Sequence, residues 1–145
     1  MADELAEAIF ANHVEDVMKD PEASRWSIER REGLVVHVTL SPRSKPDEAY
    51  LARLAWADYP GSLPASVVFL DTSTLARGVP GAWPIIAGGR PPNDICATWT
   101  AEGFVAHPEW HGDTSKAWDG GDNPVLTQIR HLQHEFDFTY QGRNQ

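Results

Sequence analysis

The sequence contains a single cysteine, Cys96, among its 145 residues. One cysteine excludes an internal disulfide, and it also excludes zinc sites that take two or more cysteine ligands from one chain. No apolar run approaches the roughly 20 residues that a membrane-spanning helix needs. The first residues are acidic, which is the reverse of the basic start of a secretory signal peptide. These absences favour a reducing, cytoplasmic setting.

Basic residues are also scarce, because 12 Lys and Arg face 21 Asp and Glu and leave a formal net charge of −9. A nucleic-acid partner and an anionic membrane surface are both disfavoured, since each is bound through clustered positive charge. Hydrophobic residues make up 41% of the chain and charged residues 23%. This balance and this length predict one folded domain spanning residues 1–145.

Hydrophobic periodicity predicts a helix at each end of the chain and four strands between them. The first helix ends at Asp20-Pro21, and the second begins at Asn123-Pro124. The expected strands are residues 25–31, 34–40, 49–56 and 67–70. The apolar stripe of the first helix is Leu5, Ile9, Phe10, Val14, Val17 and Met18, and that of the second is Val125, Leu126, Ile129, Leu132 and Phe136. Four sequential strands with helices on one face predict an antiparallel meander and the α+β class.

Residues 72–122 differ from the rest, because they hold eight of the 11 glycines and five of the 11 prolines. Long regular elements cannot fill such a stretch, and long ordered loops in compact domains are usually functional. Cys96 lies inside it. A lone cysteine is more often a small buried hydrophobe than a nucleophile, because reactivity requires exposure and thiolate character. Arg90 would favour the thiolate if it lay beside the sulfur, but the six-residue separation in sequence defines no distance between them.

Histidines form the second set of candidates. His107 and His111 flank residues 108–110, and His131 and His134 have helical i, i+3 spacing. With Cys96 or a neighbouring carboxylate they would suit a small zinc site, although helical histidine pairs are more often ordinary surface residues. No Gly-x-Ser-x-Gly elbow and no phosphate-binding loop occurs.

Three groups of short motifs follow one another in a recognisable order. They are Tyr59-Pro60, Leu63-Pro64 and residues 67–69; then Asp94-Ile95-Cys96; then Trp118 and residues 123–126. Together they resemble the ubiquitin-conjugating enzyme family, over most of residues 2–137. The first group is similar to the Tyr-Pro signature before the fourth strand, the second to the segment around the thioester-forming cysteine, and the third to the entry into the second helix.

The resemblance implies a fold and an activity. The fold is α+β and UBC-like, with an N-terminal helix, a four-strand antiparallel meander, a long active-site loop that holds the cysteine, and a C-terminal helix. Cys96 is expected to accept a ubiquitin-like modifier as a thioester from an activating enzyme and to transfer it to an amine of a target protein. No cofactor is expected.

The sequence also departs from the family pattern. The His-Pro-Asn motif that precedes the cysteine is replaced by residues 86–93, the segment between Cys96 and Trp118 is longer, and the later C-terminal helices have no counterpart. Such divergent sequences resemble bacterial conjugating enzyme-like proteins that occur beside activating enzymes and JAB-type peptidases. Some of those systems act in phage defence.

Without the family's Asn, another group is needed to stabilise the oxyanion. The candidates are Asn93 and His107. If residues 100–117 form an ordered flap over Cys96, His107 or His111 is expected to lie near Cys96, either as the oxyanion donor or as a base that keeps the thiolate available. Side chains that would assist the incoming amine are Asp94, Glu109 and Asp113. Two alternatives remain open. One is a catalytically inactive binding module of the same fold, and the other is a small metal-binding protein that uses His107 and His111.

Overall fold

The computed structural model describes residues 3–145. Its main elements are α1 (Glu4–Lys19), β1 (Ser27–Arg30), β2 (Val35–Leu40), β3 (Tyr50–Ala55), β4 (Ser66–Leu70), β5 (Gly89–Arg90), β6 (Asp94–Ile95), α2 (Ala101–Ala106) and α3 (Pro124–Phe138). Short 3₁₀ helices occupy Pro21–Arg25, Pro80–Ala82, Pro108–Gly112 and Thr114–Lys116. Within the described residues, no helix has both the length and the apolar character needed to cross a membrane.

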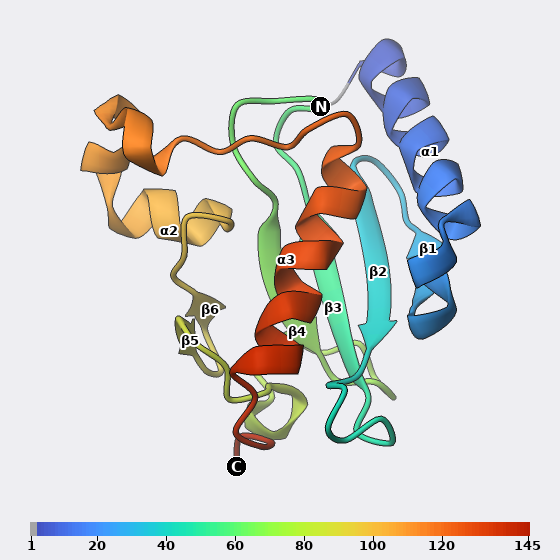
Figure 1. Cartoon of the computed structure of the whole chain (residues 1–145), viewed down its shortest axis with the longest axis vertical. Helices are drawn as coiled ribbons and strands as arrows, with labels where there is room; N and C mark the ends of the chain where they lie inside the picture. Colours follow the sequence, from blue (N-terminus) through green and yellow to red (C-terminus); the bar gives the residue numbers. More distant parts are fainter. Residues whose placement is uncertain (1–2) are drawn as a thin grey trace.

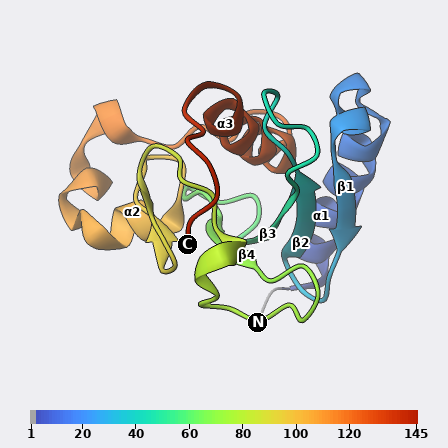
Figure 2. The same cartoon turned by 90° about the horizontal axis from the view of Figure 1, so that it is seen from below.

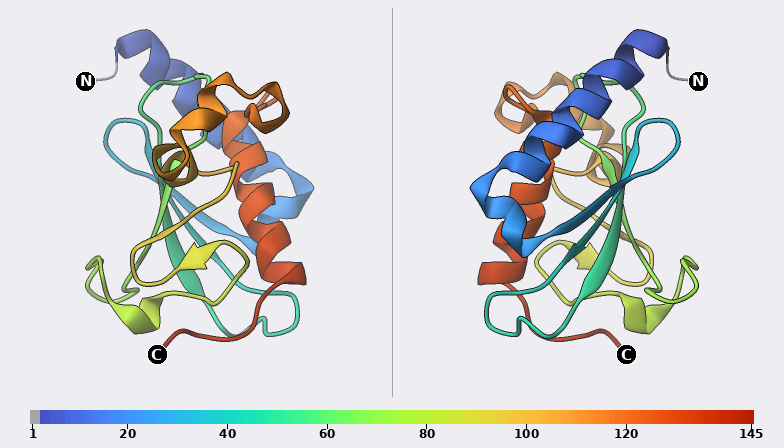
Figure 3. Two further views of the ribbon diagram at one scale, coloured as in Figure 1. Left: turned by 90° about the vertical axis from the view of Figure 1, so that its left-hand side faces the viewer. Right: turned by 90° about the vertical axis from the view of Figure 1, so that its right-hand side faces the viewer.

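The strands β1 to β4 form one antiparallel sheet in the order β1-β2-β3-β4. The predicted α+β architecture, with a helix before the meander and another after it, is therefore confirmed (Figure 1). Helices α1 and α3 contact each other and lie on the same side of the sheet (Figure 3). The first strand is shorter than the predicted 25–31, because Pro21 begins a 3₁₀ helix that is capped by the carboxylate of Asp20.

Helix α1 packs through a narrower stripe than the sequence predicts. Phe10, Val14 and Val17 are buried, as expected. Leu5 is 71% exposed and Met18 is 48% exposed, so their assignment to the buried stripe was wrong. At 3.6 residues per turn, Phe10, Val14 and Val17 share one side of the helix while Leu5 falls on the opposite side and Met18 at the margin.

Helix α3 begins as predicted. The side chain of Asn123 accepts a hydrogen bond from the Leu126 N–H at 3.2 Å, and Pro124 occupies the first turn. The predicted apolar positions are buried, except that Leu126 is only half-buried. Gln128 and Gln133 are buried as well, and the sequence pattern did not indicate this.

Asp137, near the end of α3, joins three separate parts of the chain. Its carboxylate accepts two hydrogen bonds from the Arg25 guanidinium at 2.8 Å, one from the Gln133 amide at 2.9 Å, and one from the Arg43 backbone N–H at 3.0 Å. Burial alone would raise the pKa of this carboxyl, but the hydrogen bonds outweigh burial and the pKa is lowered. The charged form of Asp137 therefore stabilises the fold.

Asp137→Asn is expected to lower the free energy of unfolding at pH 7 by roughly 1–2 kcal/mol. Because the folded-state pKa is depressed, this stability is present above the unfolded-state pKa of about 3.9 and is lost as the pH falls through the folded-state value. Urea unfolding at pH 7 and pH 3 measures both effects, and the difference in stability between the two proteins should be smaller at pH 3 than at pH 7. The exposed Asp47→Asn is the control. An equal loss in both variants would contradict the assignment.

Candidate functional site

Cys96 directly follows a small two-strand hairpin that lies outside the four-strand sheet. In this hairpin β5 pairs with β6, with Gly89 opposite Ile95 and Arg90 opposite Asp94. The Cys96 N–H donates to the Gly88 carbonyl at 2.8 Å. Gly88 has a φ of +79°, and a Cβ there would lie 2.8 Å from the Cys96 carbonyl oxygen. Only glycine permits this pairing, so the hairpin fixes the backbone at Cys96.

The hairpin places a charged pair beside the cysteine. Successive strand residues point to opposite faces, so buried Ile95 faces the core, and we infer that Asp94 and half-buried Cys96 share the other face. Arg90 binds the Asp94 carboxylate through Nε at 2.7 Å and a second nitrogen at 2.9 Å. The Arg90 guanidinium is therefore already paired with Asp94, and its action on Cys96 stays a prediction.

The C-terminal residues hold the chain that leads into the hairpin. The Ile85 N–H donates to the Gly142 carbonyl at 2.8 Å, and the Asn144 N–H donates to the Trp83 carbonyl at 2.8 Å. The Ala87 N–H donates to the Thr139 hydroxyl at 3.0 Å. The end of the chain thus lies beside residues 83–87 (Figure 2). The sequence pattern did not predict this pairing.

Thr100 binds the backbone on both sides of Cys96. Its side chain is fully buried. Its hydroxyl lies 2.6 Å from the Ile95 carbonyl oxygen and 3.1 Å from that of Ala97, and it accepts a hydrogen bond from the Gly103 N–H at 3.1 Å. Sequence reasoning missed this residue, although a threonine immediately before a helix is a typical N-cap.

Residues 100–117 form the insert between Cys96 and the final helix. They contain α2 and two 3₁₀ helices. Helix α2 contacts β4 and β6, and its first N–H, at Ala101, donates to the Ala65 carbonyl at 2.9 Å. The Glu102 carboxylate accepts a hydrogen bond from the Val67 N–H at 3.1 Å and another from the Ser66 hydroxyl. The insert is therefore anchored to the sheet beside Cys96.

Asn93 lies in the turn of the hairpin. Its N–H donates to the Arg90 carbonyl at 2.9 Å, and the residue is exposed. Three residues of fully extended chain span about 10 Å, so its backbone lies at most roughly that far from the backbone of Cys96. Within residues 3–145 no hydrogen bond joins it to Cys96, so its role as an oxyanion donor stays a prediction.

His107 and His111 contact other residues of the insert. His107 Nδ1 lies 3.1 Å from a Glu109 carboxylate oxygen, and its ring stacks on Trp110 at 4.3 Å between centroids. The ring of His111 meets the ring of Phe104 edge-on at 5.3 Å. In the part of the chain that the structure describes, no hydrogen bond connects either histidine to Cys96. These contacts favour a structural role, and the catalytic role stays a prediction.

Single replacement of each histidine with alanine separates the two roles. The contacts above predict that His107→Ala and His111→Ala leave both the loading of a modifier on Cys96 and its discharge to an amine within about threefold of the wild-type rate. An oxyanion donor would instead leave loading intact and slow discharge about a hundredfold. Loading and discharge are timed separately by gel shift. Circular dichroism checks that each variant is folded.

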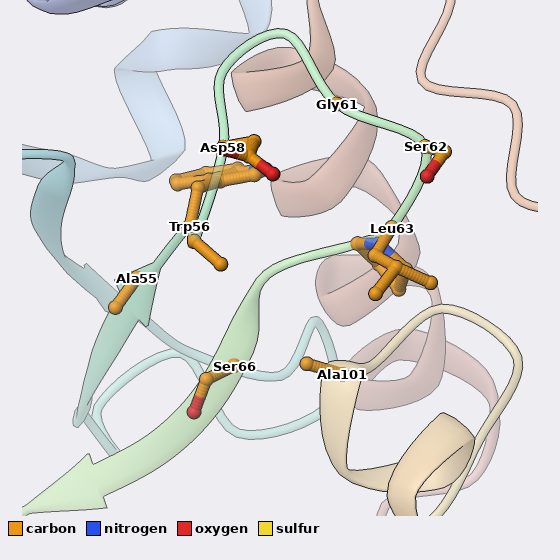
Figure 4. Close-up of a pocket in the computed structure, with 10 residues that line it drawn as sticks. Ala55, Trp56, Asp58, Gly61, Ser62, Leu63, Ser66 and Ala101 are labelled. Atoms are coloured by element: carbon orange, nitrogen blue, oxygen red, sulfur yellow. The ribbon is translucent and has the colours of Figure 1, made fainter. Parts of the chain in front are cut away.

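A pocket of about 270 Å³ lies between the end of β3, the loop before β4 and the start of α2 (Figure 4). Trp56 and Leu63 form its apolar wall, whereas Asp58, Ser62 and Ser66 are its polar side chains. A second pocket of similar volume shares Ser62 and Leu63 and continues along the insert. Its other lining residues are Phe104, Trp110, His111, Gly112, Asp113, Thr114, Ala117 and Trp118.

Metal ligation by the histidines lacks support from the geometry. Among residues 3–145, no group of three or more His, Cys, Asp or Glu side chains is placed to hold a metal ion. His131 instead stacks on Trp99 at 6.2 Å and packs on Trp118 at 5.4 Å, and burial lowers its pKa.

No protein-family model, curated protein or solved structure matches the chain.

Proposed function

We propose that the chain is a ubiquitin-conjugating-like carrier in which Cys96 holds a ubiquitin-like modifier as a thioester. The observation that carries this proposal is the placement of the single cysteine. It is half-buried, it directly follows a hairpin outside the sheet, its N–H binds the Gly88 carbonyl, and Thr100 binds the residues on either side of it. The order of helix, antiparallel meander, cysteine-bearing segment and helix is also the order that the UBC-like fold has.

The proposed reaction consists of two acyl transfers. The Cys96 thiolate attacks the thioester carbonyl of the modifier on the activating enzyme, a new C–S bond forms, and the enzyme's thiolate leaves. A target amine then attacks the Cys96 thioester, a C–N bond forms, Cys96 departs as thiolate, and the amine loses a proton. Both steps pass through an oxyanion. Asn93 is the proposed donor to it, because the contacts of His107 and His111 within the insert favour a structural role for both histidines. Asp94 is a proposed acceptor for the amine proton.

The activity is tested by mixing the protein with its cognate activating enzyme, the modifier and ATP. The expected product is a covalent adduct of the combined mass that disappears on treatment with a thiol. Omission of ATP or of the activating enzyme should prevent it. An adduct that resists thiol, or that forms without ATP, would contradict the carrier function. We propose that the carrier acts in a cytoplasmic bacterial conjugation pathway, and that phage defence is one process such a pathway serves.

A binding module of the same fold is the second candidate. The apolar pocket beside Leu63 and its continuation along the insert favour it, because they offer a recognition surface that needs no catalysis. Thiol labelling at neutral pH distinguishes the two functions. A carrier should react with iodoacetamide at a rate within about tenfold of the denatured chain, whereas a buried structural thiol should react orders of magnitude more slowly.

A further inference from the structure

We propose that Thr100 is a positioning residue for Cys96, through a buried hydroxyl that fixes the backbone on both sides of the cysteine. This inference rests on the proposed carrier function. Thr100 does not touch the reacting atoms. It acts through residues 95 and 97, and so determines where the sulfur of Cys96 is presented.

The hydrogen-bond pattern carries the first step. A hydroxyl has one proton to donate and two lone pairs that accept. The Thr100 hydroxyl donates its proton to the Ile95 carbonyl oxygen, which is its shortest contact at 2.6 Å. The lone pairs accept from the Gly103 N–H at 3.1 Å and the Ala97 N–H at 3.3 Å. The donor and both acceptor sites of this hydroxyl therefore form hydrogen bonds with backbone groups around Cys96 and at the start of α2.

The surroundings make this hydroxyl hard to replace. Thr100 has no exposed surface, so water cannot take over its hydrogen bonds. The carbonyl of the preceding residue, Trp99, accepts a hydrogen bond from the buried Gln128 amide at 2.6 Å, and Gln128 also accepts from the Ala65 N–H at 3.0 Å. The segment after Cys96 is thus bound to α3 and to the sheet, and Thr100 joins this segment to residues 95 and 97 on either side of Cys96.

The rate of acyl transfer from one protein to another depends strongly on the position of the attacking sulfur. A displacement of about 1 Å at the reacting atom can reduce a rate about a hundredfold. Alkylation by a small reagent has no such requirement and depends mainly on exposure. Loss of the Thr100 hydroxyl should therefore slow acyl transfer to Cys96 and speed alkylation of Cys96. Loss of a helix cap that only stabilises the fold would not change the two rates in opposite directions.

The test compares Thr100→Val, which keeps the shape and loses the hydroxyl, with Thr100→Ser, which keeps the hydroxyl. At a temperature well below both unfolding midpoints, Thr100→Val is expected to load modifier about 10- to 100-fold more slowly than wild type. It is also expected to react about threefold or more faster with iodoacetamide. Thr100→Ser should restore both rates to within about threefold. The exposed neighbour Thr98→Val is the matched control and should match wild type.

Several outcomes overturn the inference. One is a folded Thr100→Val that loads and alkylates like wild type, and another is an equal defect in Thr100→Val and Thr100→Ser. If Thr100→Val does not fold, Thr100→Ala is used in its place, and failure of both to fold shows that Thr100 serves the fold alone. Failure of the carrier function is separate, because wild type would then form no adduct while the alkylation rates of the variants still differ.

Discussion

Replacing Cys96 with alanine is expected to abolish the modifier adduct completely, and replacing it with serine is expected to change its chemistry. Alanine has no nucleophile. Serine has an oxygen in the same place, which forms an ester that resists thiol and is cleaved by base. Denaturing gels with and without a reducing agent distinguish the three proteins. The serine variant should also fail to pass the modifier to an amine, since an ester is less reactive than a thioester.

Neither substitution should disturb the fold, because Cys96 is half-buried and its thiol forms no hydrogen bond within residues 3–145. The free energy of unfolding should change by no more than about 1 kcal/mol. An adduct that persists in Cys96→Ala would show that another residue is modified, and it would remove the basis for the carrier function. Thr98→Ala changes a neighbouring exposed residue and should leave the adduct unchanged.

Most of the architecture could be predicted because it depends on local patterns. The alternation of Tyr50, Ala52 and Leu54 indicates a strand with one buried face, and all three residues are fully or almost fully buried. The predicted apolar stripe of α1 was wrong where it included every large apolar residue of the helix. Leu5 is apolar, but its angular position on α1 points it away from the sheet.

The surroundings of Cys96 were less predictable, because they depend on contacts between segments far apart in sequence. Gln128 reaches the Trp99 carbonyl from a helix that begins well after the cysteine. The C-terminal residues pair with residues 83–87 through backbone groups, which carry no side-chain signal. Thr100 looks like any capping residue in the sequence, and only the folded chain shows that its hydroxyl also binds the Ile95 carbonyl.

The packing of α2 against the segment after Cys96 depends on one glycine. A Cβ on Gly103 would lie 2.0 Å from the Ala97 carbonyl oxygen and 2.8 Å from the Ala97 carbonyl carbon and nitrogen. These are backbone atoms, so no side-chain rotation can relieve the clash. In an isolated helix, alanine would be better than glycine by about 1 kcal/mol. Here the clash should outweigh that preference.

Gly103→Ala is therefore expected to destabilise the protein by about 3 kcal/mol or more, or to detach the insert from the sheet. Denaturant unfolding measures the first outcome, and faster hydrogen exchange across α2 reports the second. Gly112→Ala is the matched control, because a Cβ there meets no atom within 4 Å. Wild-type stability and protection in Gly103→Ala would contradict the close packing. Because Ala97 is the neighbour of Cys96, a detached insert should also slow loading, and this links the largest expected stability effect to the proposed active site.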